Sequence, residues 1–220
     1  MRQALNQQTL KDVYRRLAGR YDTQHAFLTA HSDQRGRALV VEYAVRTGEK
    51  VLDCGAGTGS TGLLAAEKVG KDGRVTLFDL CDGMLEQARK KSGVSDRIEF
   101  QVGDMHHLPF ADGAFDVALS TYSLCPLYDP VRAALEMYRV IRPGGRIGIA
   151  HSTGPESLWV KWPAEKVEDL AWKFPSLSMG CRPVSVLPAL ERAGARVIFK
   201  KRIGVPLWPF LVVVMEKPAS

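Results

Sequence analysis

Long apolar runs and paired cysteines are both absent from this chain of 220 residues. No stretch approaches the roughly 18 consecutive apolar residues that a membrane-spanning helix requires. Residues 1–20 carry charges throughout and lack the apolar core of a signal peptide, so we expect a cytoplasmic protein. The cysteines show no C-x-x-C pairing and no zinc-ligand spacing, which predicts reduced thiols and no metal site. They are Cys54, Cys81, Cys125 and Cys181.

Dense basic tracts are also absent, although the formal net charge is +6 and the pI is near 9.2. The basic residues are spread along the chain and form no dense tract with interleaved aromatic residues, so no nucleic-acid partner is favoured. Apolar residues make up 45% of the chain and charged residues 25%, an ordinary globular balance. The length fits one domain over residues 1–220 with a sizeable core. Nothing in the sequence indicates an oligomeric state.

Strand-like and helix-like segments alternate through the middle of the chain, residues 49–151. This alternation is typical of a parallel sheet with helices on both faces. We expect Asp82 to cap a helix and residues 142–145 to form a tight turn into the last of these strands. The predicted strands are 51–54, 75–79, 97–102, 115–120 and 146–151, and the predicted helices between them are 61–69, 84–91 and 130–141.

The two ends of the chain have a different pattern. Two predicted helices, 8–19 and 35–46, precede the first strand and form an N-terminal extension over residues 1–48. The tail, residues 152–220, contains a predicted helix followed by two apolar strands, whose short connection favours an antiparallel pair at one edge. The predicted fold is therefore α/β, a doubly wound seven-stranded sheet that is mostly parallel with an antiparallel C-terminal edge pair. The tail helix is predicted at 184–193, and its strands at 196–202 and 211–216.

The glycine-rich sequence D-C-G-A-G-T-G, residues 53–59, lies between the first predicted strand and a helix. Glycines at alternate positions let the backbone approach a ligand closely, and the first amides of the helix face that ligand. Asp79 ends the next predicted strand, where a carboxylate can accept both hydroxyls of a ribose. These features predict a nucleoside-binding site.

Two nucleoside cofactors are compatible with this loop. Residues 57–62 fit G-x-G-x-x-G, which is typical of dinucleotide binding and leaves an NAD-dependent oxidoreductase as an alternative. Asp53, however, precedes the glycines, and a carboxylate facing a pyrophosphate would repel it in a poorly solvated site. A carboxylate suits S-adenosylmethionine (SAM), which carries an ammonium and a sulfonium and no phosphate. The sequence therefore favours SAM as the cofactor.

Further segments occur in a fixed order along residues 11–151. The ordered set resembles the class I SAM-dependent methyltransferases, and most closely the family that C-methylates ubiquinone and menaquinone precursors. The resemblance implies a Rossmann-like methyltransferase fold and an N-terminal helical lid that closes over the cofactor. The segments that carry it are R-Y-D at 20–22, D-G-M-L at 82–85, G-D-M at 103–105, L-P-F at 108–110, F-D-V at 115–117, E-M-Y-R-V at 136–140 and R-P-G-G at 142–145.

By this resemblance, the cofactor contacts residues from the loops after successive strands and from the lid. The lid would contribute Tyr21, and Thr121 matches a small hydroxyl residue that helps the quinone family to bind the cofactor. The remaining residues are Asp53, Gly55, Gly57 and Thr58 for the methionine part, Asp79 with Leu80 for the ribose, and Asp104 with Met105 for the adenine.

The acceptor site departs from the quinone family. An Arg-Asn pair follows the fourth strand in that family and is thought to serve the substrate, whereas this chain has Cys125-Pro126. A cysteine lacks the cationic fork of arginine, and proline lacks a donor. If the acceptor loses a proton, a general base is needed, and we expect His151 and Tyr122 first and then His25. The other histidines are His31, His106 and His107.

The expected function is methyl transfer to a small, apolar or aromatic acceptor, either quinone-like or lipid-like. The alternatives are an RNA or protein methyltransferase and a non-catalytic SAM-binding module. Residues 152–182, which contain Trp159, Trp162 and Trp172, either cover the sheet or form part of the substrate pocket. The cations and aromatic residues at 199–203 and 207–211 indicate either an edge hairpin or peripheral contact with an anionic membrane.

Overall fold

The fold is described from a computed structural model, which covers residues 4, 6–29, 32–154, 159, 162, 181–205 and 208–219. His31, Trp172 and most of the expected substrate cover lie outside the described residues. The helices are α1 (Gln7–Leu17), α2 (Tyr21–Leu28), α3 (Ser32–Ala44), α4 (Ser60–Val69), α5 (Asp82–Ser92), α6 (Pro130–Val140) and α9 (Leu187–Arg192). The strands are β1 (Lys50–Cys54), β2 (Arg74–Asp79), β3 (Ile98–Val102), β4 (Phe115–Thr121), β5 (Ile141–Ser152), β6 (Arg196–Val205) and β7 (Trp208–Glu216).

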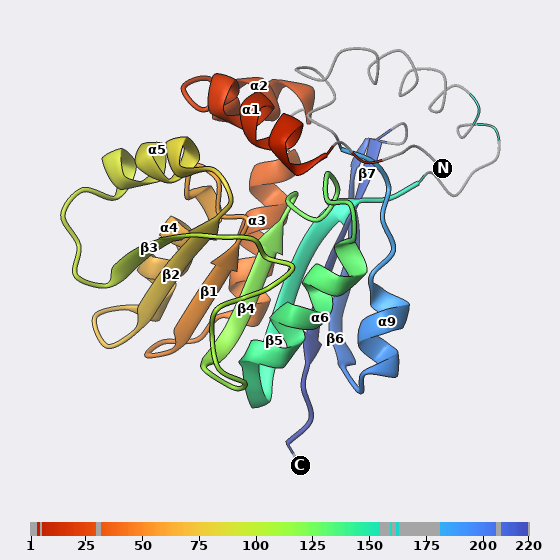
Figure 1. Cartoon of the computed structure of the whole chain (residues 1–220). Helices are drawn as coiled ribbons and strands as arrows, with labels where there is room; N and C mark the ends of the chain where they lie inside the picture. The colour runs from red at the N-terminus through yellow and green to blue at the C-terminus, as the bar shows by residue number, and fades with distance from the viewer. Residues whose placement is uncertain are drawn as a thin grey trace.

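The strands form a seven-stranded sheet in the order β3-β2-β1-β4-β5-β7-β6 (Figure 1). The first five are parallel, and β7 runs antiparallel to both β5 and β6. This confirms the predicted mostly parallel sheet with an antiparallel C-terminal edge pair. The chain places β2 and β3 on one side of β1 and then crosses back to place β4 on the other side. The direction in which strands are added therefore reverses between β1 and β4. Ligands of open α/β sheets bind at such a switch point.

Helices cover both faces of the sheet. One face packs against α3, α4 and α5 through small and aliphatic side chains such as Val40, Ala65 and Leu85. The other face packs against α6 and α9, with Met137 and Leu190 completely buried. The central strands are apolar on both sides, which explains why they are continuous hydrophobic runs in the sequence. Every helix among the described ranges is too short or too polar to cross a lipid bilayer.

The N-terminal extension differs from its prediction in two ways. The helix predicted at 35–46 is α3, which begins at Ser32 and buries Val40 and Ala44 in the core of the sheet. It therefore belongs to a covering layer and not to a lid, because its apolar side chains complete the hydrophobic core. The sequence analysis also missed α2, whose hydrophobic pattern is weak. Among the described helices, α1 and α2 lie above the carboxyl ends of the strands (Figure 1).

Two local predictions were wrong. Asp82 is the first residue of α5 and not its cap: Cys81 holds the N-cap position and makes no side-chain capping bond. Residues 142–145 do not form a turn before a strand, because β5 already begins at Ile141 and the register shifts across these residues. The amide of Gly144 donates to the Lys217 carbonyl at 2.7 Å, and the Lys217 amide donates to the Gly145 carbonyl at 2.9 Å. These two bonds join residues 144–145 to Lys217, just after β7. Residues 142–145 are therefore an irregularity within β5.

Candidate functional site

A cavity opens at the carboxyl ends of β1, β2, β3 and β4, beneath α1 and α2. Most of the residues predicted to bind a cofactor line it, together with Tyr122 from the predicted catalytic set. The structure therefore brings together residues from five separate segments of the chain. The predicted residues on the cavity wall are Tyr21, Gly55, Gly57, Thr58, Asp79, Leu80, Asp104, Met105, Thr121 and Tyr122.

The glycine loop after β1 forms one wall of this cavity. Gly55 and Gly57 have φ angles of 69° and 55°, in the left-handed region that disfavours other residues. A Cβ atom on Gly55 would lie 2.3 Å from the Cβ of Ser123, so the loop and the segment after β4 can pack this closely only with glycine. Because no side chain fits where the glycine loop meets the segment after β4, the loop exposes its backbone to the cavity.

Asp79 is fixed at the end of β2 by two backbone amides. Its carboxylate accepts hydrogen bonds from the Gly57 and Cys81 amides, each at 2.8 Å. Burial raises the pKa of Asp79, and these amides oppose that shift. The hydrogen bonds hold both carboxylate oxygens in a set orientation between the glycine loop and α5. This is the geometry that acceptance from a pair of ribose hydroxyls requires.

Asp104 occupies the corresponding position after β3. One oxygen accepts from the His106 amide at 2.9 Å and from its Nδ1 at 2.6 Å, and the other accepts from Gln7 Nε2 at 3.0 Å. Burial tends to raise the pKa of Asp104, but the hydrogen bonds from His106 outweigh it and lower the pKa. The His106 ring in turn stacks on Tyr128, with centroids 4.0 Å apart. Asp104 is therefore an oriented anion that α1 also contacts through Gln7.

Asp53 lies off the cavity, unlike the other predicted cofactor residues. Its side chain is only 1% exposed, and its Oδ2 atom has no hydrogen-bond partner. Burial raises the pKa of Asp53 to about 7, against the opposing influence of the Arg37 cation. Asp53 was expected to face the glycine loop, and its side chain packs behind the loop against Gly62, where a Cβ would lie 3.0 Å from Oδ2.

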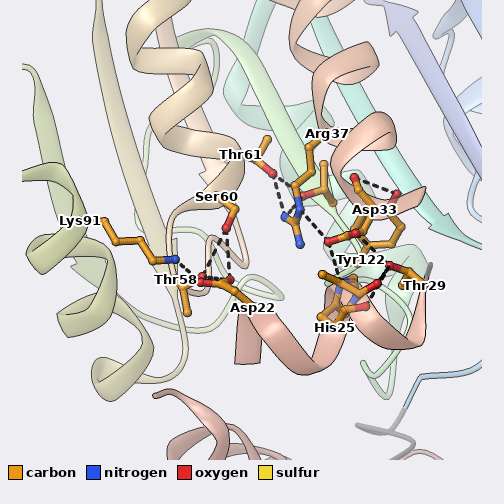
Figure 2. Close-up of polar contacts among 12 residues, drawn as sticks. Asp22, His25, Thr29, Asp33, Arg37, Thr58, Ser60, Thr61, Lys91 and Tyr122 are labelled. Carbon is orange, nitrogen blue, oxygen red and sulfur yellow. Dashed lines mark hydrogen bonds and ion pairs between the residues drawn. The ribbon is translucent and has the colours of Figure 1, made fainter. Parts of the chain in front are cut away.

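Arg37 is a cavity residue that the sequence analysis missed. It projects from α3, and its Nη1 donates to the Thr61 and Thr121 hydroxyls at 3.0 and 2.9 Å (Figure 2). Its Nε lies 3.8 Å from Asp33 Oδ2, so the guanidinium is held from two sides. The signal in the sequence was an arginine on the otherwise apolar face of a core helix, next to Val40 and Val41. A buried arginine needs partners, and such a position indicates a polar network.

The predicted catalytic residues are separated by the fold. Tyr122 lies on the cavity with a φ of 61°, which is rare for a non-glycine residue and is typical of strained functional sites. His25 lies just behind it, with ring centroids 5.3 Å apart, and its Nδ1 is 3.0 Å from Asp33 Oδ2 (Figure 2). His151 is buried away from the cavity, where its Nδ1 donates to the Ser152 carbonyl at 2.8 Å. Burial lowers the pKa of His151.

The lid is fastened to the glycine loop by one residue of α2. Asp22 accepts from the hydroxyls of Thr58 at 2.6 Å and Ser60 at 3.3 Å, and it pairs with Lys91 of α5 (Figure 2). Burial tends to raise the pKa of Asp22, but the hydrogen bond from Lys91 and those from the hydroxyls lower it. Tyr21, the neighbouring residue, is thereby held on the cavity wall.

The donors and acceptors around the cavity fit SAM. Asp79 and Asp104 are acceptors of the kind that ribose hydroxyls and an adenine amino group require, and Arg37 is a cation suited to a carboxylate. The Oδ2 atom of Asp53, which has no hydrogen-bond partner, adds negative charge behind the loop when this carboxyl group is ionised, and such a charge suits an ammonium. The same carboxylates would repel a pyrophosphate, so the wall does not suit a dinucleotide.

Comparisons with known proteins agree with this geometry. Residues 52–149 match the methyltransferase domain family. A ubiquinone/menaquinone biosynthesis C-methyltransferase from Haemophilus ducreyi is 33% identical over 153 residues, which are 68% of this chain and 59% of the relative. A demethylmenaquinone methyltransferase from Symbiobacterium thermophilum is 31% identical, with 71% and 64% covered. The chain thus spans less than two thirds of the length of these relatives.

The fold also matches solved structures. A methyltransferase from Haloferax volcanii, in complex with the activator Trm112, superposes with a TM-score of 0.69 at 22% identity. The match covers 93% of this chain and 97% of that one. Residues 52–149 therefore form a class I methyltransferase domain of the SAM-dependent type, similar to the ubiquinone and menaquinone C-methyltransferases.

Proposed function

We propose that this protein transfers a methyl group from SAM to a small, apolar or aromatic acceptor. The observation that carries the proposal is the convergence of Asp79 and Asp104 with the glycine loop on one cavity beneath the lid helices. SAM, when bound, supplies an electrophilic methyl group on its sulfonium. The protein then has to hold the donor, align the acceptor and exclude water.

Each part of SAM, the methyl donor, has a matching side chain in or behind the cavity wall. Asp79 would accept from the ribose hydroxyls, and Asp104 would accept from the adenine amino group. Arg37 would bind the methionine carboxylate, because its guanidinium is held in place by Thr61 and Thr121. Asp53 would act from behind the glycine loop, where its charge favours the ammonium without touching it.

The acceptor would lie beside Tyr122, where the cavity wall becomes apolar. Leu10, Tyr14, Pro126 and Leu127 also line the cavity and favour an acceptor with little charge. Tyr122 is the one predicted catalytic residue on the cavity wall, and its ring would position the acceptor. Its hydroxyl donates to the Asp33 carbonyl at 3.4 Å and burial raises its pKa, so it would act as a neutral group and not as a base. His25 would support it through the ring contact, with Asp33 holding the imidazole.

A quinone precursor is the favoured acceptor within this class. The similarity to enzymes named for ubiquinone and menaquinone C-methylation supports it. Cys125-Pro126, in place of the Arg-Asn pair of that family, opposes it because neither residue can bind a quinone oxygen as arginine does. We therefore expect a different set of contacts to the acceptor, centred on Tyr122.

Cofactor binding is tested with SAM and S-adenosylhomocysteine by titration calorimetry. Asp79→Ala should weaken both by at least about 100-fold, because a pair of charge-assisted hydrogen bonds is worth roughly 3 kcal/mol or more. The matched control is Asp112→Ala, whose exposed carboxylate pairs with Arg139 away from the cavity. Unchanged affinity in Asp79→Ala, or tighter binding of NAD than of SAM by the wild type, would contradict the assignment.

The acceptor class is tested by methyl transfer from labelled SAM. Hydroquinones, small phenols and a lipid extract represent the proposed class, and bulk tRNA and a protein extract represent the alternatives. Label in the small-molecule fractions supports the proposal. Label confined to RNA or protein would overturn it, and SAM binding without transfer to any fraction would favour a non-catalytic module.

Peripheral contact with an anionic membrane is proposed for the outer strand of the sheet. On β6 the side chains of Lys200, Lys201 and Arg202 are exposed, and so are Val197 and Ile198 at 40% and 49%. Cations beside exposed apolar side chains suit a lipid surface, which would deliver a lipophilic acceptor. Flotation with anionic vesicles at low salt tests this. The protein should float, and Lys200→Glu with Lys201→Glu should release it, whereas wild-type protein left at the bottom rules it out.

A further inference from the structure

Gln7 is a cavity residue to which the proposed function gives no role. It is the first residue of α1, one of the helices above the carboxyl ends of the strands (Figure 1), and it lines the same cavity as Asp104. The two residues are 97 positions apart in the sequence, yet Gln7 Nε2 donates to Asp104 Oδ2 at 3.0 Å. The helix α1 therefore directly contacts the carboxylate to which the adenine amino group is assigned.

Most of the acceptor capacity of Asp104 is already used. Oδ1 accepts from the His106 amide at 2.9 Å and from the His106 Nδ1 at 2.6 Å, and Oδ2 accepts from Gln7. An ionised carboxylate offers about four lone-pair sites, two on each oxygen, so the site that remains is on Oδ2. A ligand that donates to Asp104 therefore binds the same oxygen as Gln7.

The hydrogen bond to Asp104 also fixes which way the Gln7 amide faces. Burial tends to raise the pKa of Asp104, but the hydrogen bonds from His106 and Gln7 lower it, so the carboxylate is ionised at neutral pH. An ionised carboxylate can only accept, and the amide must present its NH2 group to it and its Oε1 atom on the other side. No described residue is hydrogen-bonded to this Oε1. Because Oε1 and Nε2 share one carbon atom, a second acceptor lies next to the site on Asp104.

An exocyclic amino group matches this pair of acceptors. The 6-amino group of adenine carries two N–H bonds, and each loses free energy if it is shielded from water without an acceptor. The remaining site on Asp104 can accept only one of them. A glutamine amide is a common partner of the adenine amino group, whereas guanine has an acceptor oxygen at the same position and would face two further oxygens here.

We propose that Gln7 is a specificity residue for the adenine base, with Oε1 accepting one hydrogen of the 6-amino group while Asp104 Oδ2 accepts the other. The inference rests on the proposed function, because it takes the adenine to lie at Asp104. It deepens that function by giving the helix α1 a part in recognising the base. Gln7 reaches Asp104 only from α1, so both acceptors are in place only when this helix covers the cavity.

The test compares S-adenosylhomocysteine with its analogue in which hydrogen replaces the 6-amino group, by titration calorimetry. Wild-type protein should bind the analogue at least about 10-fold more weakly, because the analogue cannot donate to either Asp104 or Gln7. In Gln7→Leu, the ratio of the two affinities should fall by about 3- to 10-fold, as expected for the loss of one hydrogen bond. Any loosening of α1 weakens both ligands equally, so the ratio isolates the contact with the amino group.

Gln8→Leu is the matched control. Gln8 is the next residue of α1, and its Nε2 donates to both oxygens of Asp12 at 3.2 Å within the same helix. This variant should keep the wild-type ratio. The side chains of Gln7 and Gln8 are both exposed, so both variants should also unfold at the ligand-free midpoint of the wild type.

The outcomes separate this inference from the proposed function. Wild-type protein that does not bind S-adenosylhomocysteine contradicts the proposed function itself, and the role of Gln7 with it. If the wild type binds this ligand, an unchanged ratio in Gln7→Leu overturns the role of Gln7 alone. Tighter binding of S-adenosylhomocysteine by Gln7→Leu also overturns it, because Gln7 would then compete with the amino group for Asp104.

Discussion

Gly36 on α3 makes room for the hydroxyl of Tyr122. A Cβ atom at this position would lie 2.1 Å from the Tyr122 oxygen, far closer than van der Waals contact allows. Gly36→Ala should therefore move the tyrosine ring, at a cost of about 1–3 kcal/mol in the free energy of unfolding. Gly19→Ala is the matched control, since nothing lies within 4 Å of its added carbon. Chemical denaturation of both variants measures the difference.

A second substitution separates this clash from a general helix effect. Tyr122→Phe removes the oxygen, so it should restore part of the stability that Gly36→Ala loses. The double variant should be less destabilised than the sum of the single variants, because the two residues are in contact. Strict additivity would show that the tyrosine hydroxyl does not constrain Gly36.

We expect the free energy of unfolding to depend on pH because of Asp53. Its folded-state pKa of about 7 is above the value in the unfolded chain, so its contribution is favourable at low pH and is lost as pH rises toward 7 and beyond. At pH 8 the buried carboxylate is ionised with Oδ2 unpaired, and Asp53→Asn should be more stable than wild type by roughly 1–3 kcal/mol.

The same measurement at pH 5.5 supplies the control. There Asp53 is protonated in the folded protein but ionised in the unfolded chain, so the gap between Asp53→Asn and wild type should narrow. SAM binding should change in the opposite sense, because the ammonium is attracted to the ionised form, so wild-type affinity should rise from pH 6 to pH 8. An equal stability gap at both pH values would show that Asp53 does not titrate near 7.

At the residue scale, the positions of residues relative to the predicted strands were enough to locate some site residues but not others. Asp79 and Asp104 could be predicted because each follows a strand directly, and parallel strands bring their carboxyl ends to one edge. Arg37 could not, because it reaches the cavity from the middle of a helix whose face is otherwise apolar. The position of Asp53 behind the loop could not be predicted either, since alternation along a strand does not reveal on which side of the following loop a side chain lies.

The helix α2 is held in place by one charged side chain, that of Asp22. Asp22 joins this helix to α4 and α5 through Thr58, Ser60 and Lys91. Asp22→Asn should loosen the helix and speed amide hydrogen exchange over residues 21–28 by roughly 2- to 5-fold, as expected for a partly exposed pair worth up to about 1 kcal/mol. Asp12→Asn is the control, because Asp12 contacts Gln8 and Arg15 within α1. Equal exchange in both variants would rule out the fastening role.

At the scale of elements, the strands were predicted within a few residues because buried parallel strands are short apolar runs between turn signals. The helix α2 was missed because its pattern is only weakly amphipathic, and its position depends on Asp22 and on ring contacts of Tyr21. Residues 142–145 were read as a turn from their proline and glycines. Backbone hydrogen bonds to Lys217 keep them within β5. Because Lys217 is 72 or more residues away in the sequence, the residues around 142–145 give no indication of these bonds.

At the scale of the whole molecule, the sheet order places the site. The switch between β1 and β4 leaves a crevice at the carboxyl ends, and the loops after four strands meet there beneath α1 and α2. This could be anticipated from alternating strands and helices alone. The acceptor wall could not, because it depends on how Tyr122 and the segment after β4 pack against α3.

We propose that residues 1–220 unfold as one unit, because the cavity joins α1 and α2 to the loops of the sheet and leaves no independent lid. Thermal unfolding, monitored by far-UV circular dichroism and by tryptophan fluorescence, should then show a single transition.

S-adenosylhomocysteine at 100 times its dissociation constant stabilises the folded state by about 2.7 kcal/mol. For a chain of this length that corresponds to a rise in the midpoint of roughly 5–10 °C. Asp79→Ala should unfold near the ligand-free midpoint, with a rise of no more than about 1–2 °C at the same ligand concentration. Two transitions, of which the ligand shifts only one, would instead mean that the helices above the cavity fold separately from the sheet that they cover.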